Sequence, residues 1–162
     1  KGFAVATISL ETPVSDIETL AVGLDGRITA LLAETGATQV DLVTHSMGGL
    51  VARAAMRRFG HERIARLITL AGPHHGTEIA RLGPGLNSRQ MEPGNPWLVD
   101  LNRQETPPVP TLSIWSAGDE IIAPQDSSRL AGVREIVLPA MGHLAMSLSP
   151  TMLAHVVGEL ER

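Results

Sequence analysis

The chain has 162 residues, a formal net charge of -4 and no cysteine, and these three facts exclude several classes of protein. The acidic balance argues against a nucleic-acid partner. The absence of cysteine excludes a thiol nucleophile, a disulfide framework and a thiolate metal site. Hydrophobic residues make up 43% of the chain, so residues 1–162 can bury a core as a single domain. No apolar run is long enough for an integral membrane segment.

Short apolar runs alternate with helical patterns, which predicts an α/β fold with a mostly parallel sheet flanked by helices. Residues 3–10 form the first such run and predict a buried strand. Ser15 and Glu18 have the spacing of a capping box at the start of a helix. Gly36 is the residue type expected just after that helix ends.

The later elements follow the same alternation. A helix is expected from about residue 47 to 59, and Ser149 and Pro150 have the residue types that begin a final helix. The stretch 78–110 is rich in Pro, Gly and Asn, and we expect a small cap-like or lid-like insertion with two short helices, one near 96–102. Four further strands are expected at residues 39–44, 64–71, 111–116 and 134–138. The buried face of the final helix is expected to contain Met152, Leu153, Val156, Val157 and Leu160.

Residues 44–48, Thr-His-Ser-Met-Gly, connect a predicted strand to a predicted helix, which is the setting of a nucleophile elbow. In such an elbow the serine, here Ser46, stands exposed at the carboxyl end of the sheet. Gly48 and Gly49 would let the new helix pack closely on the strands. The usual pattern has glycine where this chain has Thr44, which is also small. The alternative interpretation is that Ser46 only caps the helix.

A serine hydroxyl becomes a good nucleophile only beside a base that is oriented by an acid. Asp119 and His143 each follow a predicted strand, so both are expected at the edge of the sheet where Ser46 lies, in the order Ser, acid, His. Glu120 and Asp126 are the competing acids. The competing bases are His45, His61, His74, His75 and His155. Only His143 lies in a turn that follows a strand downstream of the acid, although it could also be a structural histidine.

These segments together resemble bacterial lipases and esterases of the α/β-hydrolase fold, above all the small Bacillus-type lipases and their actinobacterial relatives. The resemblance rests on residues 40–49, on 118–122 with 128–130, and on Gly142 with His143. It implies that Ser46 is the nucleophile, His143 the general base and Asp119 the acid that orients it. The backbone N–H of Met47 would be one oxyanion donor. Secretion is plausible by the same resemblance.

In these enzymes the second oxyanion donor comes from a loop after an earlier strand, and no such segment precedes Lys1. The missing strand would lie between the strand predicted at 3–10 and the one at 39–44. Without it, the two strands would leave backbone N–H and C=O groups unpaired. We therefore expect the native protein to contain an N-terminal segment that supplies this strand and the second donor.

The resemblance also implies a small-molecule or lipid ester substrate and no cofactor. His45 and His74 are expected near the site, and Leu82, Leu86, Met91 and Trp97 could line an acyl pocket or simply pack their segment on the core. His74 and His75 are adjacent in a loop without a carboxylate cluster, so no metal site is expected. The predicted function is carboxylic ester hydrolysis through an acyl-enzyme. The alternatives are acyl transfer or thioester hydrolysis by the same residues, and an inactive binding module.

Overall fold

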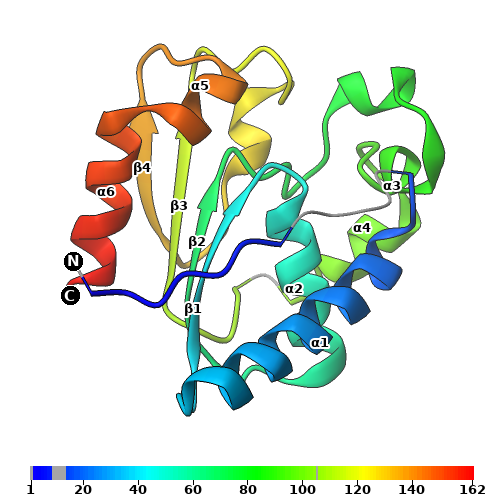
Figure 1. Ribbon diagram of the computed structural model, residues 1–162. Helices are drawn as coiled ribbons and strands as arrows, with labels where there is room; N and C mark the ends of the chain where they lie inside the picture. Colours follow the sequence, from blue (N-terminus) through cyan, green and yellow to red (C-terminus); the bar gives the residue numbers. More distant parts are fainter. Residues whose placement is uncertain (1, 9–13, 105) are drawn as a thin grey trace.

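The computed structural model describes residues 2–8, 14–104 and 106–162. Within these residues, four parallel strands form one sheet and lie in the order of the sequence (Figure 1). They are β1 (Val40–His45), β2 (Ile64–Leu70), β3 (Thr111–Ser116) and β4 (Arg134–Leu138). Each lies within one residue of the bounds that the sequence predicts. The predicted α/β class is confirmed.

Helices cover both faces of the sheet. Helices α1 (Ile17–Thr35) and α2 (Gly48–Phe59) lie on one face, and α6 (Pro150–Leu160) lies on the other (Figure 1). The short elements are the 3-10 helices η1 (Glu78–Leu82) and η2 (Gln125–Ser128), and the helices α3 (Gly85–Gln90), α4 (Pro96–Leu101) and α5 (His143–Leu148). The segment 78–110 therefore contains η1, α3 and α4, one short helix more than expected.

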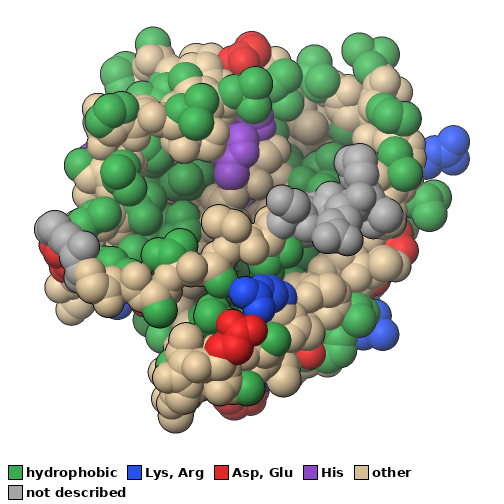
Figure 2. All heavy atoms as spheres, in the orientation of Figure 1, with side chains coloured by type: hydrophobic (Ala, Val, Ile, Leu, Met, Phe, Trp, Pro, Cys, Tyr) green, Lys and Arg blue, Asp and Glu red, His purple; other side chains and the backbone are tan. Residues whose placement is uncertain are grey.

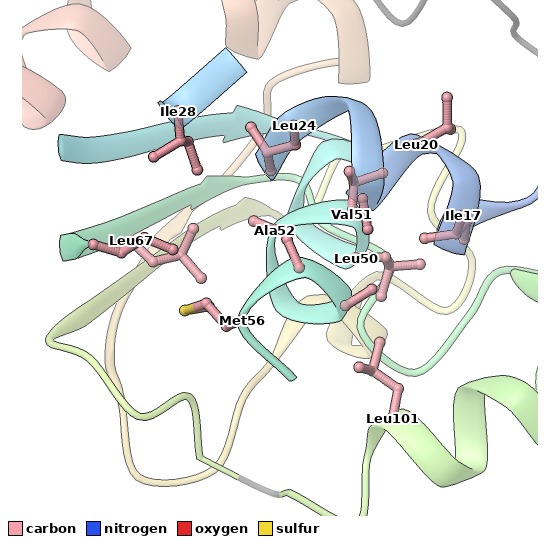
Figure 3. Packing of buried hydrophobic residues seen from close by; sticks show 14 of the residues in the cluster. Ile17, Leu20, Leu24, Ile28, Leu50, Val51, Ala52, Met56, Leu67 and Leu101 are labelled. Atoms are coloured by element: carbon pink, nitrogen blue, oxygen red, sulfur yellow. The ribbon is translucent and has the colours of Figure 1, made fainter. Parts of the chain in front are cut away.

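The larger core lies between the sheet and the two helices α1 and α2. Helix α2 is buried along most of its length because α1 covers the side that faces away from the strands (Figure 3). Leu50 of α2 and Leu67 of β2 are fully buried in this core. Burying one such side chain contributes about 1.5–3 kcal/mol. A second core on the opposite face joins α6 to β2 and β3 through Met152 and Ile114.

Helix α1 begins one residue later than the capping box predicts. Asp16, not Ser15, is the N-cap, and its Oδ1 accepts the backbone N–H groups of Glu18 at 2.9 Å and Thr19 at 3.2 Å. The Glu18 side chain does not turn back to the helix start. It accepts a hydrogen bond of 2.6 Å from Arg57 of α2 instead, so it connects two helices.

The N-terminal strand is a second difference. Residues 2–8 form no strand, and residues 9 and 10 of that prediction lie outside the described residues. As a result, β1 is an edge strand of the sheet that the structure describes. Val43 of β1 is 45% exposed, because the described residues leave the face of β1 that carries its side chain largely uncovered.

The C-terminal part differs from the prediction in two details. Helix α5, which begins at His143 itself, is not predicted from the sequence. Helix α6 begins at Pro150 with Ser149 as its N-cap, as predicted. Its buried face includes Met152 and Val156, whereas Leu153 is largely exposed because it points away from the sheet.

Candidate active site

The three candidate catalytic residues follow three different strands at the same edge of the sheet. Ser46 comes directly after β1, Asp119 follows β3, and His143 follows β4. Because all strands are parallel, their carboxyl ends meet at one edge, and that is where sites of such sheets form.

Ser46 occupies a strained turn. Its φ angle is +54°, which is uncommon for a residue with a side chain and costs on the order of 1–3 kcal/mol. The turn is held by the Ser46 N–H, which donates to the Leu70 carbonyl at 2.8 Å, and by the Gly49 N–H, which donates to the Ser46 carbonyl at 3.0 Å. A Cβ at Gly49 would lie 3.1 Å from the His74 ring and 3.4 Å from the Thr69 side chain, so glycine lets the turn pack here without a shift of the His74 ring.

Asp119 and His143 form a buried hydrogen-bonded pair. The His143 Nδ1–H donates to Asp119 Oδ2 at 2.8 Å. His143 is only 4% exposed and Asp119 only 2%. The other oxygen, Oδ1, accepts the N–H groups of Ile121 at 2.9 Å and Ile122 at 2.8 Å. Burial raises the pKa of Asp119, but the hydrogen bonds from His143, Ile122 and Ile121 outweigh it, so the pKa lies below its ordinary value. The carboxylate is therefore charged at neutral pH and leaves Nε2 of His143 free to accept a proton.

Ser116 and Gly118 hold the acid loop against the histidine loop. The Ser116 hydroxyl accepts the N–H of Gly118 at 3.0 Å and the N–H of Met141 at 2.8 Å. A Cβ at Gly118 would lie 3.1 Å from backbone atoms of Ala140 and Met141. This contact is not among the sequence predictions, although a Ser-x-Gly-Asp segment after a buried strand is a signal that could indicate it.

His45 connects the serine turn to the histidine loop. Its Nε2 lies 3.0 Å from the His143 carbonyl oxygen, and the two rings are 4.7 Å apart between centroids. The Ser46 hydroxyl itself makes no hydrogen bond with the described residues, and serine–histidine contacts of this kind often tighten only when substrate binds. Figure 2 shows histidine side chains at the surface of one face of the molecule, among hydrophobic ones.

His74 lies behind the serine turn and has no exposed surface. The sequence predicts that His74 lies near the substrate, but in this structure its ring is out of a substrate's reach. Its Nε2 lies 3.2 Å from the Thr69 hydroxyl. Burial holds the pKa of His74 well below its usual value, and the charge of Arg53 and the neighbouring His75 lower it further. His74 is therefore neutral and supports the turn from inside the molecule.

The residues expected to line an acyl pocket divide into two groups. Met91 and Trp97 pack against the larger core, and the Trp97 indole N–H donates to Glu18 at 2.9 Å. Met91 and Trp97 therefore pack their segment on the core, which is the alternative that the sequence leaves open. Leu82 and Leu86 are exposed on η1 and α3.

Two negative findings concern the part of the chain that the structure describes. No group of three or more His, Asp or Glu side chains there could hold a metal ion. No helix there is long and apolar enough to cross a membrane.

A parallel sheet with a strained serine turn after one strand and a buried Asp–His pair after two later strands defines an α/β hydrolase. Residues 23–152 match the family model of the PGAP1-like alpha/beta domain, and the chain belongs to this family. The resemblance to lipases that the sequence indicates is confirmed at the level of the family. The chain is a lipase/esterase-like α/β hydrolase.

Lipase B of Pseudozyma antarctica is 34% identical over 113 residues, which cover 62% of this chain and 32% of that lipase. The chain thus spans about a third of the length of this curated relative. The structure of a Bacillus licheniformis lipase in its mature form matches with a TM-score of 0.78 at 15% identity. The match covers 92% of this chain and 76% of the lipase chain. The structure of Aspergillus fumigatus lipase B has a TM-score of 0.74 at 19% identity, covering 83% and 39%. These two structures establish the fold.

Proposed function

We propose that the protein is a serine carboxylester hydrolase that acts on lipophilic esters through an acyl-enzyme on Ser46. The observation that carries the proposal is the buried hydrogen bond between Asp119 and His143. His45, the residue before Ser46, brings the strained serine turn into contact with this pair. The combination supplies a nucleophile, a base and an acid that orients the base.

In the proposed reaction the Ser46 hydroxyl attacks the ester carbonyl while His143 Nε2 takes its proton. The N–H of Met47, at the start of α2, donates to the oxyanion that forms. The tetrahedral intermediate collapses to an acyl-Ser46 ester, and the alcohol leaves with the proton from His143. Water then attacks the acyl group, His143 again transfers the proton, and the carboxylic acid is released. One oxyanion donor typically contributes about 3–4 kcal/mol to transition-state stabilisation.

Met47 is the oxyanion donor that we identify among the described residues. We propose that the second donor comes from a segment that pairs with the open edge of β1. Ser46 follows β1 directly, so a loop at the end of a strand beside β1 would lie next to the serine turn.

Exposed apolar side chains on two sides of the site support a lipophilic substrate. Leu144 and Leu148 lie on α5, which starts at His143, and Leu148 is 82% exposed. Leu82 lies on η1 and is 85% exposed. The start of η1 lies beside the acid loop, because the Glu78 N–H donates to the Ala123 carbonyl at 2.9 Å. Apolar surface of this kind around a polar site favours contact with acyl chains.

The test compares hydrolysis of p-nitrophenyl esters of several acyl lengths with hydrolysis of acyl-CoA. The Ser46→Ala variant is expected to lower kcat for the esters by about four to six orders of magnitude. Ser15→Ala, at a serine that precedes α1, is the matched control. A fluorophosphonate probe should label the wild type at Ser46. Faster turnover of acyl-CoA would favour a thioesterase, and folded protein without labelling would favour a binding module.

A further inference from the structure

The main chain of His143 is hydrogen-bonded on both sides by side chains from other loops. Its N–H donates to Glu120 Oε2 at 3.0 Å, and its carbonyl oxygen lies 3.0 Å from His45 Nε2. A carbonyl can only accept, so Nε2 of His45 carries the proton. The two partners are 23 and 98 residues away in sequence, so neither contact follows from local chain geometry.

Glu120 supplies a cap that the histidine loop lacks. His143 is the first residue of α5, and N–H groups in a first turn have no acceptor inside their helix. The preceding residue, Gly142, has no side chain to cap it. A Cβ at Gly142 would lie 3.0 Å from Glu120 Oε2, so glycine leaves room for the carboxylate.

His45 holds the other side of the same residue. Burial lowers the pKa of His45, the hydrogen bond to the His143 carbonyl partly opposes this, and the net pKa lies below the ordinary value. Its ring is therefore neutral at neutral pH and donates through Nε2. A neutral ring also adds no second positive charge 4.7 Å from the His143 ring when His143 takes up a proton.

We propose that His45 and Glu120 are positioning residues that fix the main chain of His143 from its two sides. His45 directly precedes Ser46, and Glu120 directly follows Asp119. Each of the other two members of the triad is thus adjacent to a residue that holds the base. The inference deepens the proposed function and rests on it, since it assigns His143 the role of general base.

Because His143 acts in proton transfer, displacing it should affect the chemical step more than substrate binding. A displacement of about 1 Å can cost a factor of roughly 100 in rate. Loss of either contact should therefore lower kcat and leave KM nearly unchanged.

The experiment uses two matched pairs of variants. Glu120→Leu and His45→Phe remove the acceptor and the donor, whereas Glu120→Gln and His45→Gln keep an amide oxygen or amide N–H within reach. The Leu and Phe variants are expected to lose roughly 10- to 100-fold in kcat, and the Gln variants to recover most of it. His61→Phe and Glu62→Leu, on the exposed turn before β2, are the distant controls.

A second readout does not depend on activity. The proton between His143 Nδ1 and Asp119 should give a strongly downfield ¹H NMR resonance, identified by its absence in Asp119→Ala. It should move or broaden in Glu120→Leu and His45→Phe and persist in the Gln variants. An inactive wild type with this same pattern would refute the proposed function but not the positioning of His143.

If the Leu or Phe variants fold poorly, Glu120→Asp tests the same contact, because its shorter side chain withdraws the carboxylate from the His143 N–H, and a fall in kcat in the same direction is expected. The proposal is overturned if the resonance and kcat stay unchanged without the two contacts. It is also overturned if KM rises while kcat stays constant, or if the Gln variants lose as much activity as their Leu and Phe partners.

Discussion

The two carboxylate oxygens of Asp119 have separate tasks. Oδ2 accepts the hydrogen bond from His143, whereas Oδ1 accepts two N–H groups of the following turn, including that of the fully buried Ile122. The first contact sets the tautomer of the base, and the second stabilises the loop. A substitution that changes one oxygen only can separate these tasks.

Asp119→Asn should damage catalysis while preserving the fold. Its amide oxygen can still accept the N–H groups of Ile121 and Ile122, but its NH₂ group would face Nδ1 of His143. The imidazole would then carry its proton on Nε2 and could not accept one from Ser46. We expect kcat to fall by about four orders of magnitude, measured with the p-nitrophenyl esters, and the melting temperature to change little.

Asp119→Ala removes both the hydrogen bond to His143 and those to the following turn, and it serves as the comparison. It should additionally lower the free energy of unfolding by roughly 2–4 kcal/mol, because the part-buried N–H of Ile121 and the buried N–H of Ile122 lose a charged acceptor. Equal stability of the Asn and Ala variants in urea titrations would contradict the assignment of separate tasks to the two oxygens.

At the scale of elements, the start of α1 distinguishes the structure from the sequence pattern. Asp16→Ala should lower the free energy of unfolding by about 1 kcal/mol, because the cap of two backbone N–H groups is lost. Ser15→Ala should change it little. A hydrogen bond from the Thr19 hydroxyl, above all, holds the pKa of Asp16 below 3.8 against the opposing effect of burial. The contribution of the ionised Asp16 cap to the free energy of unfolding is therefore complete above pH 3.8. It is lost as the pH falls through the lowered pKa of Asp16 in the folded protein.

Urea denaturation at pH 7 and again near pH 3 would measure this difference. A larger loss of unfolding free energy in Ser15→Ala than in Asp16→Ala would contradict Asp16 as the cap and support the capping box that the sequence predicts.

Strands were easier to predict than the helix ends and the N-terminal segment. Apolar runs such as residues 111–116 are bounded by turn residues, and period and composition agree there. The sequence pattern misplaces the cap of α1 because Ser15 and Asp16 are both good caps, and Glu18 at the third position after Ser15 favours the wrong one. Helix α5 has only six residues, too few for a helical period to stand out beside the Ser149–Pro150 start.

The candidate site was predictable to the extent that its signals are local. The serine turn and the Asp–His pair follow strands and have short motifs, so their positions could be read from the sequence. The contacts of His45 and Glu120 with the main chain of His143 depend on how three loops meet in space. No spacing in the chain encodes such contacts. His74 likewise has an ordinary loop sequence and only the fold shows that it is buried.

For the whole molecule, the burial of neutral histidine beneath the serine turn links stability to pH. His74 is fully buried, and its Nδ1 has no partner in the described structure, so a second proton would create a buried, unpaired N–H group. The pKa of His74 lies well below 6.5 in the folded protein because of this burial, and burial also lowers the pKa of His45 and His75.

The sign of the pH effect follows from proton binding in the two states. Below pH 6.5 the unfolded chain takes up a proton at position 74, whereas the folded protein does not. The free energy of unfolding therefore falls as the pH is lowered through 6.5, by up to about 1.4 kcal/mol per pH unit for this residue. Urea titrations between pH 7.5 and pH 5 should show this slope in the wild type.

His74→Gln should reduce the slope by about that amount, because glutamine can contact the Thr69 hydroxyl but takes up no proton. A smaller slope should remain from His45 and His75. His61→Gln, at an exposed position, controls for the loss of a histidine. If the two variants flatten the slope equally, or if His74→Gln leaves it unchanged, the buried ring under the serine turn is not what makes the fold sensitive to acid.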